Sequence, residues 1–242
     1  MAVARHRPLR ALPVLQEPVG GDARTAETAP VQTTDWALSD GGGGSRLVDH
    51  LPAYAPPSER SLLDAEKVAE IAPLLALLAP LVEYPTRSLA GQVLACRVAL
   101  EPSHAEAAAE LGAFLEWLIN EPVERTEETY TRTFYLAPVC IPYVSVHIFG
   151  DESFQRGDLM AKLRDHFERL GFDPGPELPD HLAVLLRFAE RLTDDERAEL
   201  VAYCLGGPVA RMDDQIAKTS NPYRHAVRAI RLVVAPPVTT GA

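Results

Sequence analysis

Cysteine is scarce in this sequence of 242 residues, which contains only Cys96, Cys140 and Cys204. An odd, scattered set argues against a disulfide framework and fits a reducing compartment. No C-x-x-C pair is present, and no Cys/His spacing resembles a zinc or iron–sulfur site. Cys96 lies on the apolar face of a predicted helix, so we interpret it as a buried small apolar residue rather than a nucleophile.

Long apolar runs are also missing. No run reaches the roughly 18 residues that a membrane-spanning helix needs. The most apolar stretch, residues 71–82, is short and contains Pro73 and Pro80. The N-terminal residues lack the apolar core of a signal peptide and have no adjacent arginines. We therefore expect a cytoplasmic protein that is not itself exported and has no stable membrane insertion.

An excess of positive charge is absent as well, because 34 acidic residues outnumber 23 basic ones and give a formal net charge of −11. This balance argues against nucleic acid or an anionic membrane surface as the main partner. The first 60 residues carry a net charge of −1 and the remaining 182 a net charge of −10. The acidity therefore belongs to the later part of the chain, and it permits a basic peptide partner.

The composition divides the chain into two parts. Residues 1–57 are rich in Pro, Gly, Ala and Thr, show little periodicity and include the run Gly41-Gly42-Gly43-Gly44-Ser45, which is typical of a flexible linker. We predict a flexible, disordered tail over residues 1–57 and a single folded domain over residues 58–242.

The folded part shows helical periodicity throughout. One example is a predicted helix that ends near Leu100 and places Leu89, Val93, Cys96 and Leu100 on one face. No strand-like alternation of useful length occurs; residues 139–149 could extend locally, but nothing is available to pair with them. The pattern predicts an all-α bundle of about eight or nine helices.

Several helix boundaries have local signals. Ser103–Glu106 and Thr193–Glu196 have the Ser/Thr-x-x-Glu spacing of a capping box. Gly171 is the expected C-terminal stop of a helix over about 156–170, and Gly206-Gly207 is the expected end of the helix that Thr193 begins. Asp213-Asp214 is interpreted as helix-end or surface charge.

The stretch from residue 127 to residue 149 is the most distinctive. Tyr130 and Phe134 are four residues apart, so they share one face of a predicted helix. Pro138 and Pro142 each lack a backbone donor and push the preceding residue out of the α region. The sequence therefore predicts an irregular, aromatic loop between helices, which is a common location for binding.

A second signal follows at Glu177-Leu178-Pro179-Asp180-His181-Leu182, where Pro179 is placed to open a helix. Two interpretations of Asp180 and His181 stay open. Asp180 can stabilise the first turn of the helix through the helix dipole while His181 hydrogen-bonds a loop. Alternatively, the two residues form a fixed corner on a binding face.

Catalytic patterns are weak. His147 and His181 could join Asp180 as metal ligands or as an acid–base pair, but two histidines at this separation without helical spacing are poor evidence. Ser145 lacks the glycines of a nucleophile elbow, and no Walker A or G-x-G-x-x-G motif is present. We therefore predict no catalytic residue, no metal site and no cofactor.

The order of the two signals resembles a known family. A Pro142-Tyr143-x-Ser145-Val146-His147 loop followed by Leu178-Pro179-Asp180-His181-Leu182 is similar to the nitrate reductase delta-subunit (NarJ-like) family of cytoplasmic molybdoenzyme assembly chaperones, which are related to TorD and DmsD. The resemblance covers about residues 74–233. The form Leu-Pro-Asp-His, rather than Glu-Pro-Asp-His, favours the nitrate reductase branch, and the long tail is a departure from the family.

The resemblance implies a chaperone and not an enzyme. Its expected partner is the catalytic subunit of a molybdopterin oxidoreductase, which it would hold until molybdenum cofactor insertion is complete. The protein itself would be a monomer or a homodimer. The resemblance and the aromatic pattern together place client binding at Tyr130, Phe134, Pro142, Tyr143, His147, Pro179, Asp180 and His181.

An apolar groove with an acidic rim would suit an amphipathic client helix that carries arginines. The aromatic residues of the central stretch would form its floor, and Glu124, Glu127 and Glu128 its rim. Two other interpretations remain: a helical metal-dependent hydrolase, and a helical regulatory or scaffold module without a link to molybdoenzymes.

Overall fold

The computed structural model describes residues 65–235, and its regular elements are all helical, which confirms the predicted all-α fold. The predicted tail over residues 1–57 lies outside the described residues. Nine uninterrupted helical segments are present within residues 65–235. They are α1 (Ala65–Leu78) continued by the 3-10 helix η3 (Ala79–Val82), α2 (Leu89–Leu100), α3 (Ala105–Asn120), α4 (Val123–Phe134), α5 (Val144–Phe149), α6 (Phe154–Arg169), α7 (Leu182–Phe188) continued by η4 (Ala189–Arg191), α8 (Asp194–Glu199) continued by the π-helix η5 (Leu200–Leu205) and by α9 (Gly206–Ile216), and α10 (Tyr223–Val234).

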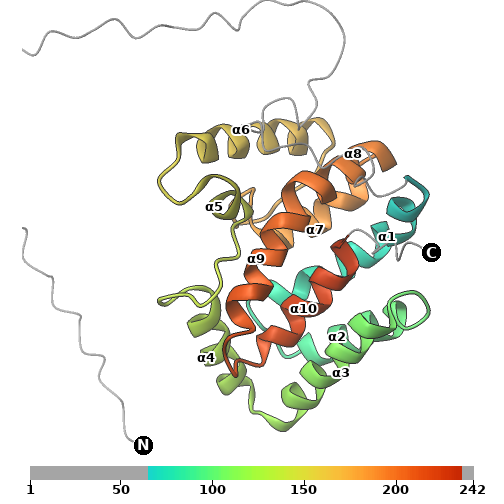
Figure 1. Cartoon of the computed structure of the whole chain (residues 1–242), viewed down its shortest axis with the longest axis vertical. Coiled ribbons are helices and arrows are strands. Elements are labelled where there is room, and N and C mark those ends of the chain that lie inside the picture. The colour runs from blue at the N-terminus through green and yellow to red at the C-terminus, as the bar shows by residue number, and fades with distance from the viewer. Residues whose placement is uncertain (1–64, 236–242) are drawn as a thin grey trace, which may run out of the picture. The chain divides into compact units, whose positions relative to one another are not determined.

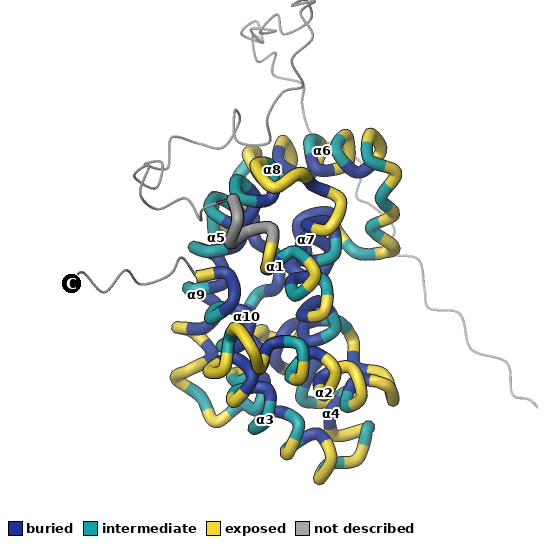
Figure 2. Tube along the Cα trace, turned by 90° about the vertical axis from the view of Figure 1, so that its right-hand side faces the viewer, coloured by how far each residue is buried: buried dark blue, intermediate teal, exposed yellow. Residues whose placement is uncertain are grey.

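Helix α10 contacts several other helices of the bundle. It packs against α3 and α9, and also touches α1 and η3 (Figure 1). Helix α2 covers the other side of α3, whereas α7 and α8 pack on α1. Buried residues run along the inward side of these helices, and exposed residues lie on their outer sides (Figure 2).

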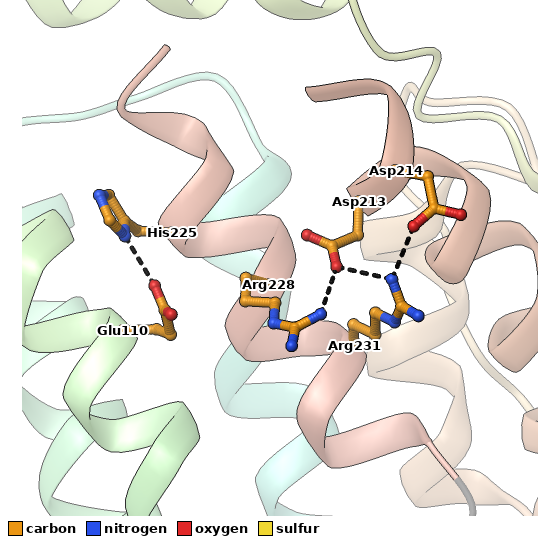
Figure 3. A network of polar contacts seen from close by, with 6 residues as sticks. All are labelled: Glu110, Asp213, Asp214, His225, Arg228 and Arg231. Carbon is orange, nitrogen blue, oxygen red and sulfur yellow. Dashed lines mark hydrogen bonds and ion pairs between the residues drawn. The ribbon is translucent and has the colours of Figure 1, made fainter. Parts of the chain in front are cut away.

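The sequence of α10 explains its central place. Its buried residues recur every three or four positions, as expected for one face of a helix, and include Val227, Ile230 and Val233. Full burial of such a side chain contributes about 1.5–3 kcal/mol. The polar face carries arginines and one histidine, His225, whose Nδ1 lies 2.6 Å from the Glu110 carboxylate on α3 (Figure 3).

An ion-pair network fixes the other side of α10. The side chain of Asp213 on α9 is only 5% exposed, and its Oδ2 accepts hydrogen bonds from Arg228 and Arg231 at 2.8 Å each (Figure 3). Arg231 also pairs with Asp214 at 2.9 Å. The interpretation of Asp213 as a helix-end or surface charge is therefore wrong: it is a buried carboxylate that joins α9 to α10.

Gly171 ends α6 as predicted. Its φ of +60° lies in the left-handed region, where a side chain is strained. The amide of Phe172 donates to the Phe167 carbonyl at 2.8 Å, and that of Gly171 donates to the Glu168 carbonyl at 3.2 Å. The Phe167 and Phe172 rings, whose centroids lie 5.0 Å apart, supply the apolar contact that accompanies this Schellman motif.

Three other boundary predictions are wrong. Pro179 does not open a helix, because α7 begins at Leu182 with His181 as its N-cap. The Thr193–Glu196 capping box forms, but the one at Ser103 does not, because α3 begins at Ala105 with His104 as its N-cap. Gly206-Gly207 does not end a helix either, since η5 carries the chain directly from α8 into α9. A Cβ on Gly206 would lie 3.4 Å from the Val201 carbonyl oxygen and 3.9 Å from that of Val234, which are ordinary van der Waals distances, so a larger residue would also fit in the continuous helix there.

The burial of Asp213 predicts that substitutions at Asp213 and at its neighbour Asp214 change the free energy of unfolding by different amounts. Asp213→Asn keeps the shape but removes the charge between two arginines, so we expect the free energy of unfolding to fall by about 1–3 kcal/mol. Asp214→Asn, at a side chain 68% exposed, should change it by less than about 0.5 kcal/mol. Urea unfolding measures both variants, and equal effects would contradict the assigned role of Asp213.

Helix α6 offers a second matched pair. Gly171→Ala forces alanine into positive φ and should lower the free energy of unfolding by about 1 kcal/mol. Gly157 lies in an exposed turn of the same helix, and a Cβ there meets nothing within 4 Å. Gly157→Ala should therefore raise the free energy of unfolding by about 0.5–1 kcal/mol. Thermal and urea unfolding should show opposite signs for the two variants; the same sign would refute the Schellman assignment.

Candidate functional site

The two sequence signals meet through one antiparallel β-bridge between Tyr143 and His181. The amide of Val144 donates to the Asp180 carbonyl at 3.0 Å, and the amide of Leu182 donates to the Pro142 carbonyl at 2.8 Å. The expectation that residues 139–149 have nothing to pair with is therefore wrong, and residues 144–149 are helical. The bridge fixes the loop after α4 against the start of α7.

The buried side chain of Asp180 stabilises the junction between the Tyr143 loop and the start of α7. Its side chain is fully buried, and its Oδ2 accepts a hydrogen bond from the Ser145 hydroxyl at the start of α5. Ser145 in turn accepts from Arg156 Nε on α6 at 2.9 Å, and Arg156 pairs with Asp151 at 2.9 Å. One buried carboxylate thus connects the α7 turn to α5 and α6.

His181 is the N-cap of α7. Its Nδ1 accepts from the Ala183 amide at 3.2 Å, so the prediction that His181 hydrogen-bonds a loop is wrong: its partner is the first turn of its own helix. The Tyr143 ring meets it edge-on, with centroids 5.4 Å apart. Burial lowers the pKa of His181, although Glu177 and Asp180 act in the opposite direction. The imidazole is neutral at pH 7, and its proton lies on Nε2 because Nδ1 is an acceptor.

His147 turns back onto its own loop. Its Nε2 lies 2.8 Å from the Ile141 carbonyl oxygen, and burial lowers the pKa of His147. The structure therefore gives His147 and His181 separate hydrogen-bonding roles. Within the described residues, no three His, Cys, Asp or Glu side chains gather in a group that could hold a metal ion.

The cysteines lie in the core. Cys96, Cys140 and Cys204 are buried and free, which confirms the apolar interpretation of Cys96. Burial raises the pKa of each thiol to about 12, with a further contribution from Asp213 at Cys140. The thiolate, which is the nucleophilic form, is therefore scarce at neutral pH.

Tyr130 and Phe134 belong to an aromatic core cluster. Both are buried, and their ring centroids lie 5.0 Å apart. Tyr223 from α10 packs against them at 5.8 and 5.4 Å, and the Tyr130 hydroxyl donates to the Val82 carbonyl at 3.1 Å. Sequence reasoning missed Tyr223; its signal is a spacing of four and seven residues from Val227 and Ile230, on the apolar face of α10.

A cleft of about 480 Å³ opens beside this cluster. Tyr130 and His181 contribute to its walls, together with Glu83, Tyr84, Asp173, Pro174, Gly175, Pro176, Glu177 and Arg187. We call it the His181 cleft.

Most of the negative charge at the His181 cleft is unpaired. Arg187 forms an ion pair with Glu83 and also donates to the Pro174 carbonyl at 3.3 Å. Asp173 accepts from the Gly175 amide, and Glu177 accepts from the Tyr135 hydroxyl at 3.1 Å. Within the described residues neither Asp173 nor Glu177 has a basic partner, so the cleft carries an excess of negative charge.

The acidic rim comes from residues other than those expected. Glu128 on α4 is held by Arg125 and Arg132 at 2.8 and 2.7 Å, and neither it, Glu124 nor Glu127 lines the His181 cleft. The neighbouring exposed apolar residues were largely missed. They are Tyr84, Tyr135 and Leu178, of which only Tyr135 belonged to the predicted aromatic stretch.

The predicted client-binding residues fall into three groups. Tyr130 and His181 are buried but line the His181 cleft; Tyr143 and His147 are half-buried; and the others are buried around the bridge or in the core, namely Phe134, Pro142, Pro179 and Asp180. Client binding at these positions stays a prediction, with Tyr143 and His181 joined most directly by the structure.

More than half of the chain is similar to a known protein family. The family model described as nitrate reductase delta subunit matches residues 99–227. A solved structure described as a candidate redox enzyme maturation protein from Archaeoglobus fulgidus is 19% identical; the match covers 65% of this chain and 89% of that chain, with a TM-score of 0.46. A search of the curated proteins finds no match. None of the described helices is both long and apolar enough to span a bilayer.

The anchor at Asp180 generates a test. Ser145→Ala removes the donor to a fully buried carboxylate, so we expect the free energy of unfolding to fall by about 1–3 kcal/mol. Ser88→Ala, at an exposed serine whose side chain does not cap its helix, should change it by less than about 0.5 kcal/mol. Urea unfolding followed by circular dichroism measures both; a neutral Ser145→Ala would exclude Asp180 as an anchor.

Proposed function

The chain belongs to the nitrate reductase delta subunit family, and we propose that it is a cytoplasmic assembly chaperone that binds the catalytic subunit of a molybdopterin oxidoreductase. Family membership rests on residues 99–227, which include both the Tyr143 loop and the His181 turn. The proposed client is of the nitrate reductase type or a relative. The chaperone assists molybdenum cofactor insertion by holding the subunit until that step is complete.

The observation that carries the proposal is the position of the Tyr143–His181 bridge beside an acidic, aromatic cleft. The bridge and the Asp180 anchor hold the walls in place, which reduces the ordering cost of binding. Tyr135 hydrogen-bonds Glu177, and Leu178 is the residue after Glu177 in the chain. The side chains of Tyr135 and Leu178 are both more than one-third exposed. Aromatic and apolar anchors supply affinity, and charged groups around them steer a partner of opposite sign.

The proposed role is binding rather than chemistry. The client segment buries apolar surface against the exposed aromatic residues, at about 25 cal/mol per Å² before the costs of association. When the client folds around its cofactor, the bound segment becomes part of the folded subunit and is removed from the binding equilibrium. Release then follows from mass action without hydrolysis of a nucleotide.

Among the alternatives, no grouping of residues within the described chain favours a metal-dependent hydrolase. A regulatory or scaffold module uses the same kind of surface, so it is separated from a chaperone by the identity of the partner. The client and its cofactor state are therefore the quantities to measure.

Co-expression of the tagged chain with a molybdopterin oxidoreductase catalytic subunit of the same host provides the test. We expect a stable complex by size-exclusion chromatography with light scattering, with Kd at least about tenfold lower for the cofactor-free subunit than for the loaded one, because folding around the cofactor withdraws the bound segment. In cells without the chain, the molybdenum content of the subunit should fall.

Surface variants locate the contact. Tyr135→Ala removes a half-exposed aromatic beside the His181 cleft and should weaken client binding by about tenfold. Phe154→Ala removes an aromatic that is 96% exposed on α6 and does not line the cleft, so it should bind normally. If no such catalytic subunit binds and its molybdenum content is unchanged without the chain, the proposed function is wrong.

A further inference from the structure

Helix α2 is apolar on its outer face as well as on its core face. The core face packs against α1 and α3. On the opposite face, Leu94 is 47% exposed and Val98 is 59% exposed. The outer face of a surface helix normally carries polar or charged residues. An apolar outer face on α2 therefore indicates that another protein surface covers it.

The outer face of α2 is also uncharged. Helical spacing groups four exposed residues on it, namely Gly91, Leu94, Ala95 and Val98. We call these four residues the α2 face. Arg97 is the only charged residue of α2, and its Nε points to the side, 3.8 Å from the position that a Cβ on Gly112 of α3 would take. Because the chain has a net charge of −11, an uncharged face is where two copies approach with the least repulsion.

The two ends of α2 carry opposite charges in unfavourable places. Arg87 lies just before the helix, and Glu101 is its C-cap. Both are exposed, and neither forms an ion pair within the described residues. The helix dipole disfavours a cation near the N-terminus and an anion near the C-terminus. A second helix that runs antiparallel to α2 brings its opposite end to each charge, so both contacts become favourable.

The shape of the α2 face is complementary to itself in an antiparallel pair. With a two-fold axis midway between Leu94 and Ala95, Val98 of one copy lies opposite Gly91 of the other. A large side chain thus meets a position without one, which allows the two helices to pack closely. Leu94 and Ala95 each lie beside their own counterpart at the axis.

The same register pairs the charges. With a rise of about 1.5 Å per residue, Arg87 comes within about 2 Å, measured along the helix axis, of Glu101 of the second copy. The two-fold symmetry gives this pair twice. One register therefore satisfies the apolar residues and both charged ends.

We propose that the α2 face is a homodimer interface, at which α2 of one copy packs antiparallel on α2 of a second copy, with an Arg87–Glu101 ion pair at each end. A helix pair of this length buries less than the roughly 1,200–2,000 Å² of a standard interface, so the dimer is weak, with a Kd on the order of 10 µM. None of the residues that line the His181 cleft belongs to α2, so the inference does not rest on the proposed function.

Sedimentation velocity of the full-length chain from about 1 to 200 µM measures the association. We expect a reversible monomer–dimer equilibrium. Val98→Asp places a carboxylate of each copy in the contact and should weaken the dimer at least about tenfold, while the urea midpoint stays the same because Val98 is exposed. Phe154→Asp is the matched control: Phe154 is 96% exposed on α6, and this variant should dimerise normally.

Charge reversal tests the register. Arg87→Glu leaves only carboxylates at each end of the interface, and Glu101→Arg leaves only guanidinium groups, so each variant alone should weaken the dimer by about tenfold. A mixture of the two variants should form a heterodimer with wild-type affinity, because one copy is then acidic at both positions and the other basic. The double variant should self-associate like the wild type.

Cysteine cross-linking distinguishes antiparallel from parallel packing. Ala95 lies at the two-fold axis, so Ala95→Cys should form a disulfide between copies under mild oxidation. The two copies of Arg87→Cys lie about 20 Å apart and cannot do so, whereas a parallel pair would bring them together. The native cysteines do not interfere, since they are buried and burial raises the pKa of each thiol to about 12.

A chain that stays monomeric at about 200 µM would overturn the inference. So would a dimer that Val98→Asp leaves intact, the absence of a heterodimer in the mixture of charge variants, or a cross-link through Arg87→Cys. If the chain is monomeric and Val98→Asp weakens binding of the catalytic subunit, the α2 face belongs to the client and self-association is wrong. The proposed function is tested with the catalytic subunit and stands or fails separately.

Discussion

Two backbone hydrogen bonds at the Tyr143–His181 bridge determine the geometry of the site. They join a loop that follows α4 to the first turn of α7, although these segments are distant in sequence. Without them, Asp180 would not reach Ser145, and the His181 ring would not lie against Tyr143. Because the bridge is a single pair and not a sheet, its stability depends on the buried Asp180 anchor beneath it.

The scaffold around this bridge is held by both apolar and ionic contacts. The apolar face of α10 closes the core, while Asp213 accepts from two arginines on the opposite face. A buried carboxylate of this kind is costly when unpaired, so it favours the one arrangement of α9 and α10 that places both guanidinium groups beside it. The helix register is therefore specified by charge as well as by packing.

Local signals in the sequence predicted local structure well. The helical spacing, the Thr193 cap and the stop at Gly171 are set by neighbours within a few residues, and each is confirmed. The local capping signal at Ser103 failed, because His104 takes the cap position. Other predictions failed where distant segments decide the outcome. The burial of Asp213 depends on the arginines of α10. The Tyr143–His181 pairing is likewise non-local, so helical periodicity contains no information about it.

The position of α10 has a consequence for synthesis on the ribosome. Tyr130 and Phe134 pack against Tyr223, and α3 packs against α10, so earlier helices remain incompletely covered until residues 223–234 have left the exit tunnel. Translation proceeds at about 5–20 residues per second, which leaves this aromatic face open to solvent for seconds after α4 has been made. The nascent protein thus exposes apolar surface during its own synthesis, and its last helix closes the core.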